Sequence, residues 1–283
     1  MASPDQLMKR AAQADSEELW QLLRNDNRDV LSKAIHNRIF SEEMALFVAK
    51  RRNVHFDTLA FLARDTRFKD SYKLKLAICK NPKTPQKVVL SLLKFLRVFD
   101  LADLAKEHQV NINIRRKIEY LLAERMSSMP SGVKKALARR AGGNILALLI
   151  ESGDAGVVSA CLDSPFLTEG LLYKLIIRTS VKPALIRMTA ESRKWSSRYY
   201  IKFGLIRSFH TPMRHVLQFI KAMKTPDLRD LYADPKLPAS TRPFIYRELG
   251  DRGEDIRDKG EDTFVLPDDE DSDIQSLEDG LNE

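Results

Sequence analysis

The feature of this sequence that most constrains its fold is an internal repeat with an offset of 127 residues. The segment TPQKVVLSLLKFLRVFDLADLAKE at 84–107 aligns without a gap with TPMRHVLQFIKAMKTPDLRDLYAD at 211–234. The same register holds without insertion when residues 19–125 are placed over 146–252, and most non-identical pairs keep apolar opposite apolar. Such self-similarity is the sequence signature of repeat architectures, whose stacked units bury one continuous core.

The apolar residues within each half follow the spacing of helices. One apolar stripe in the second half consists of Met213, Val216, Leu217, Ile220 and Met223. Intervals of three and four residues place such side chains on one face of a helix. No segment alternates convincingly between apolar and polar residues, as a half-buried strand would. The pattern predicts an all-α protein, in which we expect Leu217 and its counterpart Leu90 to be equivalent buried positions.

Each half divides further into short helices separated by polar stops and caps. Ser41 and Thr168 are placed to cap helices, Asp57 is placed likewise, and Thr84-Pro85 opens a helix with proline at its first position. We expect helices over 16–24, 28–36, 41–51, 56–64, 70–80, 84–97, 99–106 and 112–125, a basic joining helix near 131–140, and their counterparts at an offset of 127, ending near residue 249. Short helix pairs cannot bury their apolar faces alone, so these helices must stack.

The repeat predicts an α-solenoid built from two tandem half-repeats. Residues 1–126 form the first half-repeat in this interpretation, and residues 127–253 form the second. Residues 251–283 contain 14 acidic and 3 basic residues and few aromatics. A composition of that kind cannot bury enough apolar surface to fold, so we expect an acidic, disordered tail over 254–283.

The charge of the chain is divided unevenly between the body and this tail. Residues 1–250 contain 44 basic and 25 acidic residues, a charge of +19, whereas residues 251–283 carry −11. A strongly basic body predicts an acidic partner, either an acidic protein or peptide or a nucleic acid. We also expect the covalently attached tail to mask the body electrostatically at low salt, because tethering gives it a high local concentration.

One candidate binding segment is 106–140, which has nine basic and three acidic residues. Such a segment can hold phosphates or a carboxylate-rich peptide if its cations line one side of the solenoid. The candidate partner-binding residues are Arg115, Arg116, Lys117, Arg125, Lys134, Lys135, Arg139 and Arg140. The alternative is that the segment is a solvated linker region between the half-repeats.

A second candidate combines basic and aromatic residues that recur at the offset of the repeat. The set is Arg67, Phe68, Tyr72 and Lys75, matched by Lys194, Trp195, Tyr199 and Lys202. Basic and aromatic side chains together can bind a nucleic-acid backbone and stack on its bases. The alternative is that the aromatic rings staple the start of a helix.

The run Asn81-Pro82-Lys83-Thr84-Pro85, followed by a long leucine-rich helix, resembles the Asn-Pro-x-Thr-Pro units of bacterial leucine-rich-repeat-variant and HEAT-like proteins. Residues 22–37 and 149–164 resemble HEAT-type units, in which an Asp or Gly turn precedes an apolar helix. The resemblance covers 16–250 and implies a HEAT-like superhelix. Some variant-repeat proteins carry an N-terminal cysteine cluster for iron–sulfur binding. This chain has no cysteine before Cys79, so the resemblance implies no such cluster here.

No motif in the sequence indicates catalysis, a metal or a cofactor. The chain lacks GxGxxG, GxxxxGK[ST] and GxSxG, and none of its histidines lies in an HExxH motif. His210 and His215 are the closest histidine pair, and a spacing of five residues does not place both rings on one helix face. Cys79 and Cys161 lie in apolar helical patterns and are expected to be small buried hydrophobes.

No apolar run approaches the roughly 18 residues that a membrane helix needs, and the N-terminal residues lack the apolar core of a signal peptide. We therefore expect a cytoplasmic protein with no membrane partner. The sequence predicts a non-enzymatic helical-repeat scaffold that binds an acidic protein or peptide on a basic surface. A nucleic-acid-binding HEAT-like repeat protein is the alternative.

Overall fold

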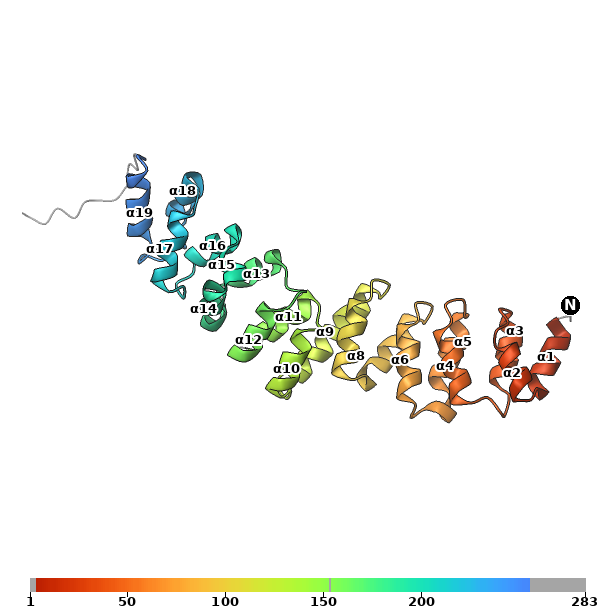
Figure 1. Ribbon diagram of the computed structural model, residues 1–283. Helices are drawn as coiled ribbons and strands as arrows, with labels where there is room; N and C mark the ends of the chain where they lie inside the picture. Colours follow the sequence, from red (N-terminus) through yellow and green to blue (C-terminus); the bar gives the residue numbers. More distant parts are fainter. Residues whose placement is uncertain (1–3, 153, 255–283) are drawn as a thin grey trace, which may run out of the picture.

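The computed structural model of the protein describes residues 4–152 and 154–254. These residues form 19 α-helices and two short 3-10 helices, and they contain no β-strand, which confirms the predicted all-α class. The helices follow one another along an elongated molecule, so that the first and last helices lie at opposite ends (Figure 1). Of the predicted tail over 254–283, only Glu254 lies within the described residues.

The helix boundaries repeat with the offset of the sequence. The elements of the first half are α1 (Pro4–Gln13), α2 (Ser16–Leu22), α3 (Arg28–Ile35), α4 (Glu42–Lys50), α5 (Phe56–Arg64), η1 (Thr66–Phe68), α6 (Tyr72–Lys80), α7 (Gln86–Leu92), η2 (Leu93–Phe95), α8 (Val98–Lys106) and α9 (Ile112–Met126). Those of the second half are α10 (Ser131–Ala138), α11 (Gly143–Glu151), α12 (Ala155–Leu162), α13 (Glu169–Ile176), α14 (Pro183–Glu191), α15 (Arg193–Ser196), α16 (Tyr199–Ile206), α17 (Met213–Lys221), α18 (Thr225–Ala233) and α19 (Arg242–Asp251). Helices α3, α5 and α8 begin and end 127 residues before α12, α14 and α18.

Helix α10 is the counterpart of α1 and not a connector between the halves. It begins at Ser131, which is 127 residues after Pro4, and it packs on α12 as α1 packs on α3. The sequence analysis did not predict α1, because its apolar residues are few and only partly buried, as Leu7 and Met8 show. The repeat therefore begins about one helix earlier than the sequence register indicated.

The predicted caps are confirmed at two positions and wrong at two. Ser41 accepts a hydrogen bond from the backbone N–H of Met44, and Thr168 caps α13 in the same way. Helix α5 is capped by His55 and already includes Asp57 in its first turn. The carboxylate of Asp57 interacts favourably there with the positive end of the helix dipole. Thr84 instead donates its hydroxyl to the carbonyl of Ile78 at 2.6 Å, so it closes the end of α6.

Cationic side chains satisfy the carbonyls at the ends of the helices. Arg125 donates to the carbonyls of Leu96 and Lys94, both at 2.9 Å, and so joins the end of α9 to the end of the α7–η2 segment. Its counterpart Arg252 donates to the carbonyls of Met223 and Lys221, at 2.8 and 3.2 Å. The last carbonyls of a helix have no partner within it, and the negative end of the helix dipole favours a cation. Each such arginine therefore stabilises the helix two positions earlier in the chain.

Two buried asparagines make the same kind of connection. Asn81 donates its side-chain N–H groups to the carbonyls of Ala49 and Arg51, at 2.8 and 2.7 Å, and accepts the backbone N–H of Lys83. Asn37 makes the equivalent contacts with the end of α1. A buried amide is tolerated where its donors and acceptor are paired. The asparagine of the Asn-Pro-x-Thr-Pro run thus holds α6 to the end of α4.

The helices form two rows, and the two halves exchange places between them. Helices α4, α6, α8, α10, α12 and α14 pack one on the next, and α7, α9, α11, α13 and α16 form a second row. At the offset of the repeat, α4 and α6 correspond to α13 and α16, which lie in the other row. The first half contributes nine α-helices, α1 to α9. Because nine is odd and most successive helices alternate between rows, these counterparts change row.

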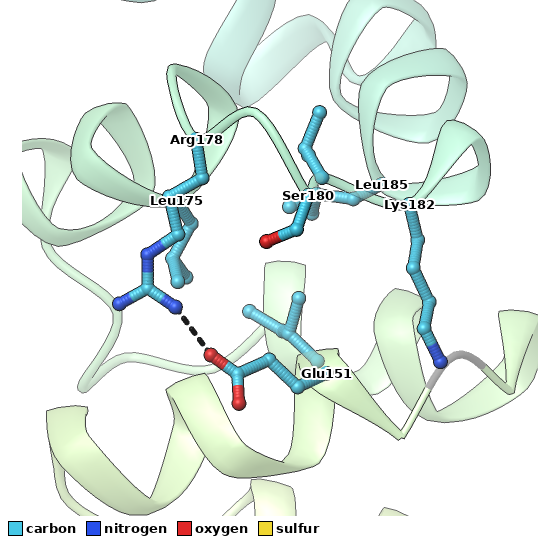
Figure 2. A pocket seen from close by; sticks show the side chains of 8 residues that line it. Glu151, Leu175, Arg178, Ser180, Lys182 and Leu185 are labelled. Carbon is cyan, nitrogen blue, oxygen red and sulfur yellow. Dashed lines mark hydrogen bonds and ion pairs between the residues drawn. The ribbon is translucent and has the colours of Figure 1, made fainter.

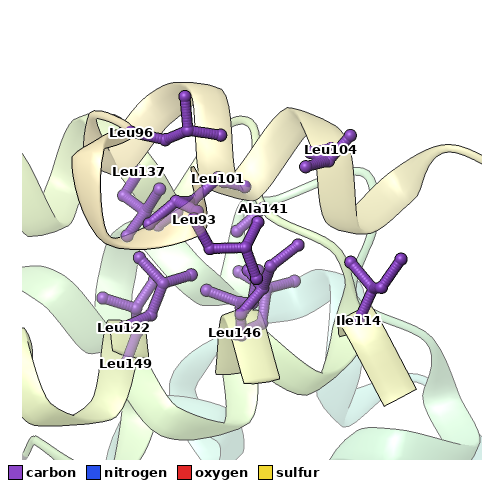
Figure 3. Close-up of a cluster of buried hydrophobic side chains, with 14 of the residues drawn as sticks. Leu93, Leu96, Leu101, Leu104, Ile114, Leu122, Leu137, Ala141, Leu146 and Leu149 are labelled. Atoms are coloured by element: carbon purple, nitrogen blue, oxygen red, sulfur yellow. The ribbon is translucent and has the colours of Figure 1, made fainter. Parts of the chain in front are cut away.

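One apolar core runs through the array and continues across the junction between the halves. Figure 3 shows side chains of η2 and α8, such as Leu93 and Leu101, clustered with Leu122 of α9 and with Leu137 and Leu149 of the second half. All of these side chains are fully buried. The apolar core therefore continues without a break past residue 126.

The expected burial of Leu217 is wrong. Its side chain is 37% exposed, and Leu90, its counterpart, is only partly buried. On α17 the buried side chains are Val216, Phe219 and Ile220. Phe219 is buried where Leu217 was expected to be, so the buried face of α17 is rotated away from Leu217.

We expect Ile220 and Leu217, two members of the predicted apolar stripe, to differ in their contribution to stability. Ile220→Ala should lower the free energy of unfolding by about 2–5 kcal/mol, because it leaves a cavity in the core. Leu217→Ala, on the same helix, should change it by less than about 0.5 kcal/mol. Urea denaturation of both variants measures the difference. An equal loss in the two variants would show that the helix is turned differently.

The contribution of the hydrogen bonds from Arg125 to the free energy of unfolding can be measured in the same way. Arg125→Met removes two charge-assisted hydrogen bonds at a partly buried site, and should lower the free energy of unfolding by about 1–3 kcal/mol. Arg116→Met is the matched control on α9, because Arg116 is exposed and makes no hydrogen bond or ion pair with any described residue. We expect the control to stay within about 0.5 kcal/mol of the parent. Similar losses in both variants would contradict the role of Arg125.

Candidate binding surface

Several of the predicted partner-binding residues make hydrogen bonds or ion pairs within the fold. Arg115 donates to the carbonyls of Glu107 and His108, at 2.8 and 3.2 Å. Arg125 closes the end of the α7–η2 segment, and Arg140 pairs with Asp103. These guanidinium groups are used where a helix ends. Their positive charge remains, but one or two nitrogens of each guanidinium group already donate to a carbonyl or a carboxylate.

The other predicted residues do not share one side of the array. Consecutive residues of a helix point about 100° apart, so Arg116 and Lys117 diverge from each other and from their neighbour Arg115. Lys117 lies over the ring of Tyr120, with its Nζ 4.4 Å from the ring centre. Lys135 lies over Gly156 of α12. Arg116, Lys134 and Arg139 make no ion pair or hydrogen bond with the described residues, and their binding role stays a prediction.

The recurring basic and aromatic set connects neighbouring helices. Trp195 is buried, and its Nε1 donates to the carbonyl of Leu162 at 2.9 Å. Tyr72 donates its hydroxyl to Asp100 and accepts the backbone N–H of Arg97 at 3.0 Å. Partial burial, with the hydrogen bond to Asp100 as the second cause, raises the pKa of Tyr72. Since these contacts recur at Tyr199, the set has a structural role that the alternative interpretation anticipated in part.

The basic excess of the body is concentrated nearer the C-terminus than the sequence analysis placed it. Residues 178–247 contain fifteen basic and four acidic residues, whereas residues 127–177 contain five basic and four acidic residues. Cations of this region without an ion pair or side-chain hydrogen bond to the described residues are Lys182, Arg187, Arg193, Lys202, Lys221, Lys224, Lys236 and Arg247. A running count of charge along the sequence identifies this region, which a single total for residues 1–250 and a count over 106–140 do not.

Some of these cations lie on α14, α17 and α19, which are connected by the Arg214–Glu191 pair and by the packing of α17 on α19. On α17, Arg214, Leu217 and Lys221 are all exposed and lie three and seven residues apart, which places them on one face. Arg214 reaches Glu191 at the end of α14, at 3.4 Å. Helix α19 packs on α17 and on α18, and it exposes Tyr246, whose ring lies 6.0 Å from that of Tyr232 on α18, and Arg247.

We call this surface the α17 face and define it by its members. They are Arg187 and Glu191 of α14, Arg214, Leu217 and Lys221 of α17, and Tyr246 and Arg247 of α19. The α17 face thus combines four cations with one carboxylate. Its apolar side chains are Leu217, 37% exposed, and Tyr246, 50% exposed. A surface of this kind suits a ligand that carries both carboxylates and apolar side chains.

A small cavity lies before the first helix of this surface, between the ends of α11 and α13. It has a volume of about 240 Å³ and is lined by Leu175, Ser180, Lys182 and their neighbours. Figure 2 shows Arg178 and Glu151 joined by an ion pair at its side, with the hydroxyl of Ser180 nearby. Both partners of the pair are about half exposed, so the pair contributes roughly 0–1 kcal/mol. The cavity is smaller than most small-molecule sites, which measure ~300–1,000 Å³.

A larger cavity, of about 570 Å³, lies at the ends of α2 and α4. Arg51 and Asp26 line it, and they are bound to each other, while Arg51 also donates to the carbonyls of Leu23 and Asn25. His55 at its rim faces Asp57, with no serine or cysteine among the lining residues. The lining groups therefore stabilise one another and do not form a nucleophile–base pair.

The two cysteines are buried in the core, and burial raises the pKa of the Cys79 and Cys161 thiols to about 12. A thiol with such a pKa is protonated at neutral pH and is a poor nucleophile. Among residues 4–152 and 154–254, no group of three or more His, Cys, Asp or Glu side chains is arranged to hold a metal ion. No helix in these ranges is long and apolar enough to cross a membrane.

Comparisons with known proteins do not extend the assignment beyond the architecture. The chain matches no family model, no curated protein and no solved structure. The fold and the charges of the α17 face are therefore the observations from which a function can be argued.

Proposed function

We propose that this protein is a non-enzymatic α-solenoid scaffold that binds an acidic protein or peptide, and that the α17 face is the binding surface. The observation that carries the proposal is the combination of unpaired cations, Lys221 and Arg247, with the exposed apolar side chains Leu217 and Tyr246. Carboxylates of the partner would pair with the cations, and its apolar side chains would cover Leu217 and Tyr246. Charge complementarity of this kind favours rapid association and selects against basic partners.

The arrangement of the helices supports a HEAT-like or leucine-rich-repeat-variant type of solenoid. Helices recur at a fixed offset, each contacts mainly its neighbours, and side chains at one helix end close the helix two positions earlier. Extended arrays of this kind present long surfaces to their partners. The buried cysteines and the self-paired cavity residues support a scaffold over an enzyme, and we place the scaffold in the cytoplasm.

Nucleic acid is the second candidate, because two aromatic rings near the basic residues are strongly exposed. Tyr200 is 66% exposed and Phe209 is 78% exposed. Lys202 and Arg207 lie close to them in the chain. Exposed rings among cations can stack on unpaired bases. The α17 face favours a peptide instead, because Leu217 and Tyr246 offer apolar contact beside the cations.

The test is the affinity of the protein for a fluorescein-labelled peptide of glutamate, aspartate and leucine residues, followed by fluorescence anisotropy. The double variant Lys221→Gln, Arg247→Gln should weaken binding about tenfold, which corresponds to ~1.4 kcal/mol. Both side chains are exposed and make no internal ion pair, so the substitutions should leave the fold intact. If the α17 face is the binding site, the loss of peptide affinity in this variant should increase as the salt concentration is lowered.

The matched control is Arg116→Gln, Arg139→Gln, which removes two equally unpaired cations from the segment between the halves. Its affinity should stay within about twofold of the parent. A larger loss in the control than in the α17 variant would move the binding site to that segment. Tighter binding of a single-stranded oligonucleotide of equal charge, lost in Tyr200→Ala, Phe209→Ala, would favour nucleic acid and contradict the peptide proposal.

A further inference from the structure

The composition of residues 255–283 complements the α17 face. The segment contains twelve acidic and two basic residues. It also carries two apolar groups, Phe264-Val265-Leu266 and the pair Ile274 and Leu277. The α17 face offers four cations and two exposed apolar side chains. The segment therefore has the chemistry expected of a ligand for this surface, and this inference rests on the proposed function.

The point at which the segment leaves the described chain brings it to this surface. Glu254 follows the end of α19, the helix that contributes Tyr246 and Arg247 to the α17 face. The 29 residues of 255–283 can extend to at most ~100 Å. Helices α17 and α19 pack side by side and so lie about 8–10 Å apart, and the Arg214–Glu191 pair brings α14 next to α17, so the face is short beside this length. The segment is long enough to cross the whole face and turn back.

The last described residue already shows a contact of the expected kind. The carboxylate of Glu254 pairs with the guanidinium group of Arg229 on α18. Arg252, two residues earlier, donates to the ends of α17 and to Glu248, which fixes the direction in which the chain leaves α19. The chain thus departs from a position held by ion pairs against the basic region of the body.

We propose that the α17 face takes residues 255–283 of its own chain as an intramolecular ligand, which an external acidic partner must displace. Tethering gives the segment a local concentration on the order of millimolar at the face. Even weak pairing of carboxylates with Lys221, Arg214 and Arg247 is then populated, and it weakens as the Debye length falls with added salt. The same surface serves the proposed partner and the segment, so the two compete.

The first measurement compares the full chain with a chain that ends at Glu254, using the labelled acidic peptide described above. Truncation should tighten peptide binding by about fivefold or more at low salt, and by much less at high salt, because it removes a tethered competitor. A full-length control, Asp268→Asn, Asp269→Asn, Glu270→Gln, Asp271→Asn, keeps the length and removes four charges. It should bind the peptide with an affinity between those of the other two chains. Equal affinities of all three at low salt would overturn the proposal.

The second measurement does not depend on an external ligand. A carbodiimide joins lysines to nearby carboxylates without a spacer, and mass spectrometry of the full chain should find Lys221 linked to carboxylates of 255–283. Lys134, unpaired and in the other part of the body, is the reference lysine and should show no such link. Mixing isotope-labelled and unlabelled chains distinguishes links within one chain from links between copies. Links found only between copies, or found equally at Lys134, would overturn the intramolecular proposal.

The two measurements separate the failure of this inference from the failure of the proposed function. If Lys221 is linked to the segment but neither chain binds the peptide, the segment is supported as the ligand of the face and the proposal of an external acidic partner is contradicted. Peptide binding that is lost in Lys221→Gln, Arg247→Gln but unchanged by truncation, without links at Lys221, would keep the function and overturn the segment as ligand.

Discussion

The ends of the helices are the constraint on which the rest of this structure depends. Most of the helices span seven to ten residues. An isolated helix of this length is marginal in water, and its final carbonyls have no partner within it. Here Arg125 and Arg252, and the buried amides of Asn37 and Asn81, donate to those carbonyls from the helix two positions later. Each helix thus depends on a later one, and a linear stack of helices follows.

The same bonds change how the charge of this protein should be interpreted. A count along the sequence treats every lysine and arginine as available to a partner. Arg115, Arg125 and Arg140 are held by backbone carbonyls or by an acidic neighbour, so part of each guanidinium group is already bound within the fold. Lys221 and Arg247 make no such contact with the described residues. A binding surface is therefore defined by the cations that the fold leaves unpaired, and that distinction requires the coordinates.

The sequence predicted the all-α class, the repeat offset and most helix positions, because apolar spacing and polar caps are local signals. It predicted neither α1, whose apolar residues are few, nor the exposure of Leu217. On α17 two overlapping apolar stripes were possible, and in the fold the one with Phe219 is buried. The α17 face combines residues from α14, α17 and α19, and its members become neighbours only through the stacking.

The exchange of rows between the halves has a consequence for partners. Helices α4 and α6 of the first half correspond to α13 and α16 of the second, but the two pairs lie in opposite rows. Equivalent outward-facing stripes on these helices therefore lie on opposite sides of the array. Two similar ligands on these stripes would sit back to back, without touching each other. Further copies of the repeat would present their equivalent surfaces on alternate sides of the array. With nine α-helices in the first copy, duplication creates a second site that points away from the first.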